Sequence, residues 1–317
     1  MSFQLSEPIL IVGIGGVGTK LATKAKDLLK SDCLLISNDQ KDLDSDCKSI
    51  KISTKSVVNP SVQLIRGAAY EDSESIKNQI SKYSTIVILA NLAGKAGSAL
   101  GPVVSHLCKE ENKNVLSFTI MPFKFEKDRI FQSGISLKRI REYSGCTIVL
   151  DNDALLDSNP DLSPIACHNI SNAAIWNVIR SLETTSIPEA TSILSTSKDV
   201  PNVEDSFKDS LRMLYEDAPP NSIKRSILYI LGGENIPVGV LNSVTNIAST
   251  VFNQENTSVS PSFGTAEKSK VIMLSSIQGE THFDKYDPLS VISQEKTLDW
   301  EQPECSIDFE SELYQLE

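Results

Sequence analysis

The chain has 317 residues, of which 40% are hydrophobic, and a formal net charge of −11. This composition is typical of a globular protein and predicts two domains. No apolar run reaches the roughly 18 residues of a membrane helix, and the first residues lack the order of a signal peptide, so we expect a cytoplasmic protein without direct membrane insertion. Six cysteines without C-x-x-C spacing and three scattered histidines predict neither a bound metal nor a disulfide framework.

The negative charge is concentrated near the carboxyl end. Residues 280–317 hold eleven acidic side chains and two lysines, which give −9 of the net charge. The rest of the chain is close to neutral and offers no basic face, which argues against nucleic-acid binding. We expect residues 280–317 to be an acidic disordered tail that binds an adaptor protein through spaced apolar side chains, with a purely solubilising tail as the alternative.

Apolar segments and helical patterns alternate from residue 9 to residue 153. The expected strands are 9–13, 33–37, 85–90, 114–123 and 147–151, and the expected helices are 19–29, 73–83, 102–110 and 129–143. Because the strands are apolar without interruption, the pattern predicts an α/β fold with a Rossmann-like, mostly parallel sheet covered by helices on both faces.

Two loops of small residues follow the first and third of these strands. The first loop carries G-x-G-x-x-G at Gly13, Gly15 and Gly18, and the second loop is the segment 93–99. A strand that turns into a helix through glycines presents backbone N–H groups at the positive end of a helix dipole, which binds phosphate. A dinucleotide fold needs only the first loop, so the second loop favours another kind of nucleotide-binding protein.

The second half of the chain changes character after a long helix. Ser163 and Pro164 predict an N-cap and a first helical residue. Beyond that helix, a polar helix at 203–215, a strand at 226–233, a helix at 237–251 and a strand at 270–279 predict a small α+β domain. The expected organisation is a nucleotide-binding domain (1–162), a central helix (163–186), a C-terminal α+β domain (187–279) and the tail (280–317).

The order of these motifs resembles the tubulin/FtsZ superfamily, in a form divergent from archaeal and bacterial FtsZ-like proteins. The resemblance spans roughly residues 8–280. It rests on GIGGVGTK in the first loop, Ser37-Asn38-Asp39, PFKFE at 122–126 with Arg129, Asn152-Asp153, and LGGE at 231–234. It implies a GTP- and GDP-binding cytoskeletal protein, with Mg²⁺ held through the nucleotide phosphates. It also implies head-to-tail filaments, formed with itself or with a related FtsZ-like polymer, in cell division or cell shape.

The resemblance also implies which residues bind the nucleotide. They come from the two glycine loops and from the ends of the strands nearby: Gly13, Gly15, Gly16, Val17, Gly18, Thr19, Lys20, Asp39, Gly94, Gly97, Ser98, Ala99, Glu126, Arg129 and Asn152. Asn169 and Asn172 compete for the role of the central-helix asparagine that contacts the base, and the sequence leaves both open.

Two departures from the family pattern predict weak or absent GTP hydrolysis. The segment 93–99 has alanine or lysine where the family has glycine, and a Cβ restricts how closely backbone approaches phosphate. After the central helix, where the family carries two acids that position water against the neighbouring subunit's γ-phosphate, the chain offers Ser186 and Glu189. A serine hydroxyl does not supply the negative charge of a carboxylate.

Two other functions remain as alternatives. A non-hydrolysing, nucleotide-bound scaffold or regulator of a related polymer would have the same fold and lack only the turnover. An NAD-dependent oxidoreductase is the second, because Asp39 lies 21 residues after Gly18, where an acid would bind ribose. The dehydrogenase alternative leaves the 93–102 loop, PFKFE and LGGE unexplained.

Overall fold

The computed structural model describes residues 2–43, 46–55, 58–182, 187–188, 191–200, 202–231, 236–252, 257–261 and 270–286. All of these belong to one compact unit that ends at Asp287. Ser186 and Glu189, most of LGGE, and the predicted tail from residue 287 onward lie outside the described residues.

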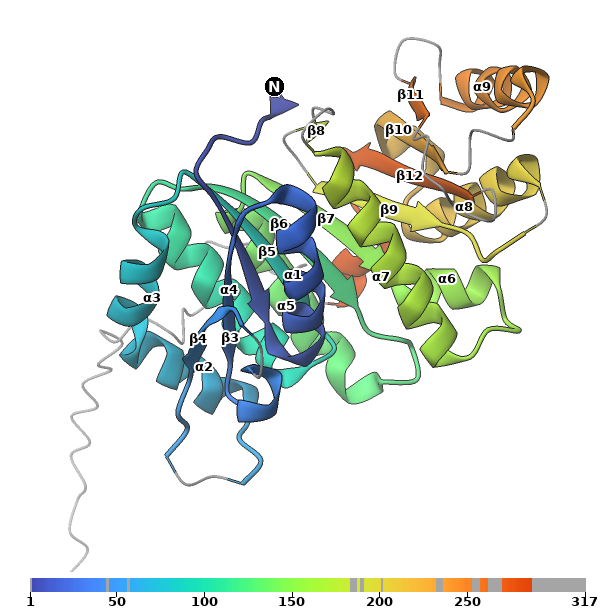
Figure 1. Cartoon of the computed structure of the whole chain (residues 1–317). Coiled ribbons are helices and arrows are strands. Elements are labelled where there is room, and N and C mark those ends of the chain that lie inside the picture. The colour runs from blue at the N-terminus through green and yellow to red at the C-terminus, as the bar shows by residue number, and fades with distance from the viewer. Residues whose placement is uncertain are drawn as a thin grey trace, which may run out of the picture. The chain divides into compact units, whose positions relative to one another are not determined.

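A ten-stranded sheet organises the described residues, in the order β11-β10-β12-β9-β7-β6-β5-β2-β3-β4 (Figure 1). Its strands are β2 (Ile9–Ile14), β3 (Asp32–Ser37), β4 (Lys48–Lys51), β5 (Thr85–Asn91), β6 (Asn114–Met121), β7 (Cys146–Asp151), β9 (Thr191–Thr196), β10 (Ile223–Leu231), β11 (Thr257–Pro261) and β12 (Lys270–Ile277). All neighbours pair in parallel except β12, which is antiparallel to both β9 and β10. The predicted mostly parallel α/β sheet is therefore confirmed.

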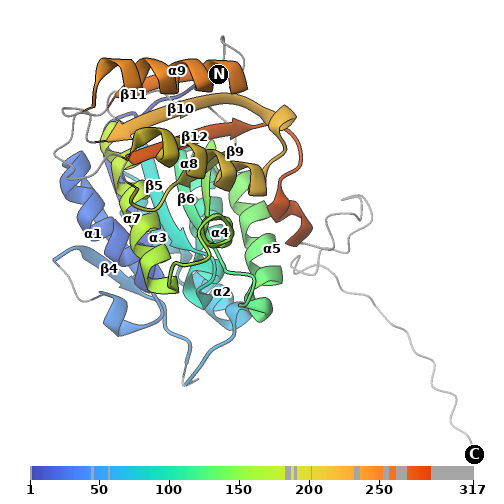
Figure 2. The same ribbon diagram turned by 90° about the vertical axis from the view of Figure 1, so that its right-hand side faces the viewer.

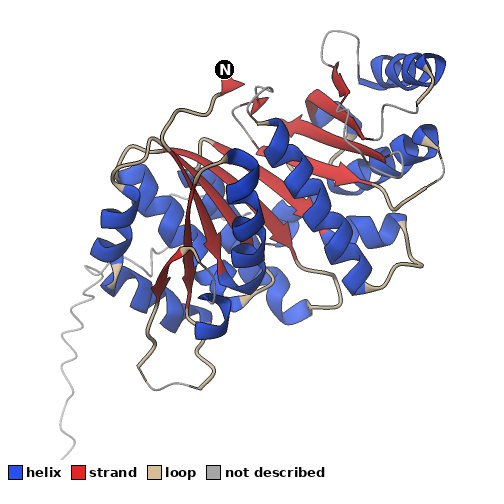
Figure 3. Cartoon of the chain, in the orientation of Figure 1, coloured by secondary structure: helices blue, strands red, loops and turns tan. Residues whose placement is uncertain are grey.

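Helices cover both faces of this sheet (Figures 2 and 3). They are α1 (Gly15–Leu29), α2 (Val62–Glu71), α3 (Ser73–Ile80), α4 (Lys95–Glu110), α5 (Lys127–Tyr143), α6 (Asn152–Ser158), α7 (Pro164–Ser181), α8 (Val203–Asp217) and α9 (Val238–Phe252). The core on one face is built with α1, α6 and α7, and the core on the other with α2 to α5, α8 and α9. Strand β2 shows that both faces of the sheet are buried. Leu10, Val12 and Ile14 belong to the core on one face, and Ile9 and Ile11 belong to the core on the other.

The sequence placed the starts of two helices too late: α1 begins at Gly15 and not at residue 19, and the error is larger for α4. We expected a helix from Pro102, but α4 begins at Lys95 and contains Pro102 in its interior. Gly94 is its N-cap, and the Ser98 N–H already bonds to the Gly94 carbonyl at 3.0 Å. Proline favours a first helical turn, and that preference hid the true start. As a result, Gly97 and Ser98 lie in the first turn of a helix, Ala99 follows them in the same helix, and none of the three lies in a loop.

Two short segments pack at the edges of the unit. Strand β1 (Ser2–Phe3) pairs antiparallel with β8 (Ile187–Pro188), directly after the segment that contains Ser186. Residues 282–286 form a 3₁₀ helix (η5) on α5, with Phe283 buried and the Arg141 guanidinium 2.8 Å from the Asp284 carboxylate. Residues 280–286, which the sequence assigned to the tail, are therefore part of the folded unit.

Candidate functional site

The first glycine loop is shaped by close backbone contacts. Gly15 has a φ of +65°, a left-handed backbone conformation that residues other than glycine rarely adopt. At Gly18 an added Cβ would lie 2.2 Å from the Leu89 carbonyl oxygen of β5, so only glycine lets α1 approach this strand. A Cβ on Gly13 would lie 2.6 Å from the Cβ of Ala22. The spacing G-x-G-x-x-G therefore fixes the start of α1 tightly against the sheet.

The second loop is built in a similar way at the end of β5. A Cβ on Gly97 would lie 1.9 Å from the Asn91 carbonyl oxygen, which no side chain tolerates. The Asn91 side-chain oxygen accepts the Ala93 N–H at 2.9 Å, and the Ser98 hydroxyl donates to the Leu92 carbonyl. Asn91 was missed by the sequence analysis, although an asparagine between a strand and small residues is typical of such a turn.

The two loops meet at the carboxyl ends of adjacent strands. A Cβ on Gly15 would lie 2.9 Å from the Ala96 methyl group, so the first turn of α1 touches the first turn of α4. The first N–H groups of a helix have no partner inside that helix, and each helix start carries partial positive charge. Two such starts in contact create an edge that attracts an anion.

A third segment approaches this edge from the end of β3. Asp39 is exposed, and its side chain accepts the Lys41 N–H at 3.0 Å at the start of the 3₁₀ helix η1 (Gln40–Leu43). Asp42 lies closer to the first loop: a Cβ on Gly16 would be 2.7 Å from Asp42 Oδ1. The Ser37 hydroxyl donates to Asp42 Oδ2 at 2.6 Å. The structure thus places Asp42, which the sequence analysis did not single out, beside the glycines.

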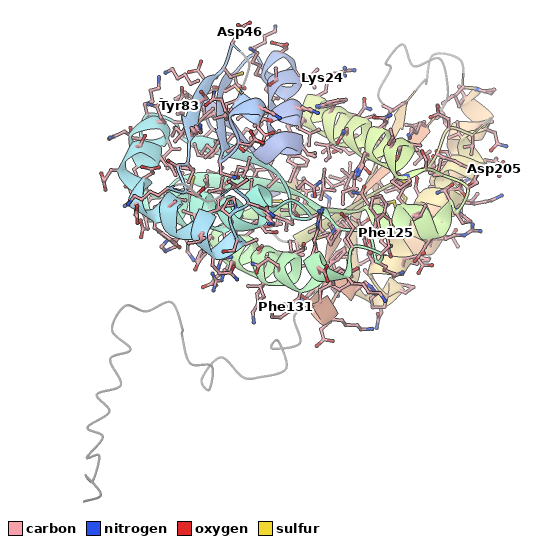
Figure 4. All side chains as sticks on the ribbon, turned by 90° about the horizontal axis from the view of Figure 1, so that it is seen from below. Lys24, Asp46, Tyr83, Phe125, Phe131 and Asp205 are labelled. Atoms are coloured by element: carbon pink, nitrogen blue, oxygen red, sulfur yellow. The ribbon has the colours of Figure 1, made fainter. Side chains whose placement is uncertain are left out.

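Glu126 and Arg129 form a pair at the start of α5. The Arg129 guanidinium lies 2.8 Å from one Glu126 oxygen, and the other oxygen accepts the Phe123 N–H at 3.1 Å. The Arg129 side chain is 56% exposed, so its guanidinium remains accessible to an anion. Phe125, labelled in Figure 4, is 61% exposed and stacks on Phe123 with ring centroids 5.0 Å apart.

The predicted asparagines differ in their surroundings. Asn152 is buried, accepts the Ser171 hydroxyl at 2.8 Å and has its amide 3.4 Å from His168 Nδ1, so it joins the start of α6 to α7. Asn169 is exposed and Asn172 is half-buried. Asn172 lies one turn before Trp176, whose indole N–H donates to the Leu21 carbonyl of α1 at 3.2 Å. Of the two candidates, Asn172 therefore lies on the part of α7 that faces α1, which Figures 1 and 2 show side by side.

The remaining predicted residues divide between structural and exposed positions. Thr19 is buried and donates to the Gly16 carbonyl at 3.1 Å, while Val17 is half-buried and Lys20 is exposed. Gly94 is the N-cap of α4, and Ala99 is fully buried. Among the described residues, no group of three or more His, Cys, Asp or Glu side chains is arranged to hold a metal ion. None of the described helices combines the length and apolar character needed to cross a bilayer.

Fold and site together define an α/β protein in which two glycine turns and two helix starts meet at one edge of a mostly parallel sheet. Residues 8–160 match the model of the Tubulin/FtsZ family, GTPase domain. This part of the chain, just under half of it, is therefore similar to the GTPase domain of that family, and the resemblance seen in the sequence is confirmed.

Archaeal FtsZ proteins are among the curated relatives of the chain. The chain is 28% identical over 189 residues to Cell division protein FtsZ 2 of Halobacterium salinarum, covering 56% of this chain and 47% of that protein. It is 26% identical over 195 residues to Cell division protein FtsZ 2 of Haloferax volcanii, covering 57% and 48%. The matches thus span about half the length of these relatives.

Solved structures share the fold over more of the chain. An FtsZ mutant (W319Y) of M. jannaschii superposes with a TM-score of 0.68 at 17% identity, covering 86% of this chain and 91% of that one. CetZ2 from Haloferax volcanii, a GTPγS-bound protofilament, gives 0.66 at 15% identity, covering 89% and 97%. The fold is therefore that of FtsZ and CetZ beyond the GTPase domain as well.

Proposed function

We propose that the chain binds GTP and GDP at the edge where the two glycine loops meet, as an FtsZ-like cytoskeletal protein. The contact between Gly15 and Ala96 carries this proposal, because it brings two helix starts together at one anion-binding edge. Arg129 would add a mobile cation, and Asn172 or Asn169 would read the base. A Mg²⁺ ion would reach the site with the phosphates, since oxygen ligands suit it.

Titration calorimetry with GTP, GDP, ATP and NAD tests this proposal. Leaving buried base-reading groups unpaired costs about 1–3 kcal/mol, so GTP and GDP should bind about tenfold or more tighter than ATP. Gly97→Ala should abolish binding, because its Cβ would enter the Asn91 carbonyl. Gly67→Ala is the matched control, since a Cβ there meets nothing within 4 Å. Tighter binding of NAD than of GTP would favour the dehydrogenase alternative instead.

Self-assembly is the second part of the proposal. A head-to-tail contact that does not close produces a filament, and CetZ2, which has the same fold, is a protofilament in its solved structure. We expect the nucleotide edge of one subunit to meet the side of the next that carries residues 184–189. Sedimentation with GTP and Mg²⁺ over a range of concentrations should show large assemblies. A protein that binds GTP but stays monomeric would instead support the scaffold alternative.

Hydrolysis should be slow in such an assembly. Ser186 takes the place of a carboxylate that would orient the attacking water, and this kind of assistance contributes about 10²–10⁴-fold. Ser186→Asp should therefore raise phosphate release, and Glu189→Ala should remove the residual activity. Glu204→Ala on α8 is the control for Glu189→Ala. Ser192→Asp is not a suitable control for Ser186→Asp, because Ser192 is buried. A fast wild-type rate that Glu189→Ala leaves unchanged would contradict this assignment.

A further inference from the structure

Two cysteines that are distant in sequence lie side by side at one edge of the sheet. Strands β3 and β4 are parallel, with Leu34 opposite Lys48, so Cys33 and Cys47 precede a matched pair. Neighbouring strands lie about 4.8 Å apart, which falls within the Cα separation of about 4.4–6.8 Å that a disulfide spans. A side-chain hydrogen bond joins the two thiols. The register therefore places the two thiols next to each other at this edge of the sheet.

The two thiols have different surroundings. Cys33 is 7% exposed and belongs to the core under α1, and this burial raises the pKa of its thiol. Cys47 is half-buried, and its sulfur is hydrogen-bonded to the Lys26 ammonium of α1. Asp27 is a further charged group near the pair. Figure 4 labels Asp46, the neighbour of Cys47, and Lys24 of α1 on the same side of the molecule. The Lys26 ammonium therefore lies where it can stabilise negative charge that develops on the Cys47 sulfur during attack.

We propose that Cys33 and Cys47 form a peroxide-reactive dithiol that closes to a disulfide in the folded protein. The Cys47 thiolate attacks one oxygen of hydrogen peroxide, the O–O bond breaks, and the released hydroxide takes a proton to become water. Cys47 is then a sulfenic acid. The Cys33 sulfur attacks it, the S–S bond forms as the S–O bond breaks, and the departing hydroxide takes the Cys33 proton. Two thiols and one peroxide thus give one disulfide and two waters.

The disulfide would restrain the segment that approaches the glycine loops. Residues 34–46, which it would enclose, include η1 and Asp42, whose carboxylate lies against Gly16. An incoming phosphate must displace this carboxylate because like charges repel, and a tethered segment moves less easily. This consequence rests on the proposed GTP site. The oxidised protein should bind GTP on the order of tenfold more weakly, which corresponds to about 1.4 kcal/mol.

The chemistry is tested on the full chain with hydrogen peroxide, followed by a non-reducing peptide map and circular dichroism. We expect a linked peptide pair containing Cys33 and Cys47 while the fold is retained. The buried Cys108, Cys146 and Cys167 serve as internal controls and should stay thiols. Cys33→Ser should leave a sulfenic acid on Cys47 that dimedone labels. Lys26→Met should slow the reaction, and Lys26→Arg should restore it.

Two results would overturn the dithiol. One is a folded, oxidised protein without the Cys33–Cys47 linkage, and the other is a Cys33→Ser protein whose Cys47 is labelled no faster than Cys108. GTP titration of reduced and oxidised protein is a separate measurement. Equal affinities would refute the coupling to the nucleotide site and leave the disulfide established. Failure of the reduced protein to bind GTP would refute the proposed function, whatever the peptide map shows.

Discussion

A buried pair of carboxyl groups predicts an unusual dependence of the stability of this fold on pH. Asp151 ends β7 and Asp217 ends α8, and their side chains are 1% and 2% exposed. Burial raises the pKa of Asp151 to about 7, and burial together with the Asp151 carboxylate raises the pKa of Asp217 well above its usual range. A side-chain hydrogen bond joins the two groups, with the proton on Asp217. Two carboxylates at one site share a proton because both cannot ionise cheaply.

The direction of the effect follows from the raised pKa values. Between about pH 4 and pH 7 both folded carboxyl groups keep protons that the unfolded chain has lost, so the free energy of unfolding falls as pH rises. Each pKa unit corresponds to about 1.4 kcal/mol. The shift of Asp151 from 3.8 to about 7 alone corresponds to at most about 4 kcal/mol of stability lost by pH 7, and the raised pKa of Asp217 adds to this loss.

Asp217→Asn tests this reasoning, because an asparagine amide can still donate to Asp151 without needing a proton. The variant should match the wild type near pH 4 and become more stable relative to it by about 1.4 kcal/mol for each pH unit up to pH 7. Urea unfolding at a series of pH values measures the difference. Asp209→Asn, on the same helix, is the matched control and should leave the slope unchanged. A difference between wild type and Asp217→Asn that stays constant with pH would refute the shared proton.

Three further predictions concern the site and the ends of the fold. Gly97→Ala should lower the free energy of unfolding by more than about 2 kcal/mol, because the added Cβ would collide with the Asn91 carbonyl. Gly67→Ala should raise the free energy of unfolding by about 0.4–1 kcal/mol. Chemical unfolding of the two variants tests both values. Arg129→Gln should weaken GTP binding in calorimetry, with Lys138→Gln, exposed on the same helix, as its control. Truncation after Asp287 should leave the melting temperature nearly unchanged, whereas truncation after Gly279 should lower it by several degrees, because it removes Phe283 and the partner of Arg141.

The sheet and the two loops were predictable because their signals are local. An uninterrupted apolar strand, a glycine turn and a following helix occupy consecutive residues, as in Ile9–Leu29. The contacts that the sequence analysis did not predict join segments that are distant in the sequence. Asp42 reaches Gly16, Cys33 lies beside Cys47, and Asp151 lies beside Asp217, each through strand pairing or helix packing that is decided by the whole fold. A charged or thiol side chain has no sequence period that would reveal such a partner.

The sequence predicted a helix start correctly where a side-chain cap marks it and no other residue gives a competing signal. Ser163 caps α7 as expected, and its hydroxyl accepts the Ala166 N–H at 3.2 Å. At α4 the helix starts on small residues after Gly94, without a side-chain cap, while Pro102 gave a stronger and misleading signal. The structure also adds α2, β4, β9 and β11, which the sequence analysis did not assign.

The altered second loop keeps glycine where the backbone has no room for a side chain. Gly97 is retained, and its Cβ would collide with Asn91. The substituted positions point elsewhere: Ala93 is buried, the Ala96 methyl packs against Gly15, and Lys95 reaches Asn59 Oδ1 at 2.8 Å. The methyl groups therefore fill space inside the unit, and the lysine is held by a neighbouring loop. Because the two helix starts still meet, the divergence of this loop restricts the backbone conformations at the edge and leaves the backbone N–H groups in place for an anion.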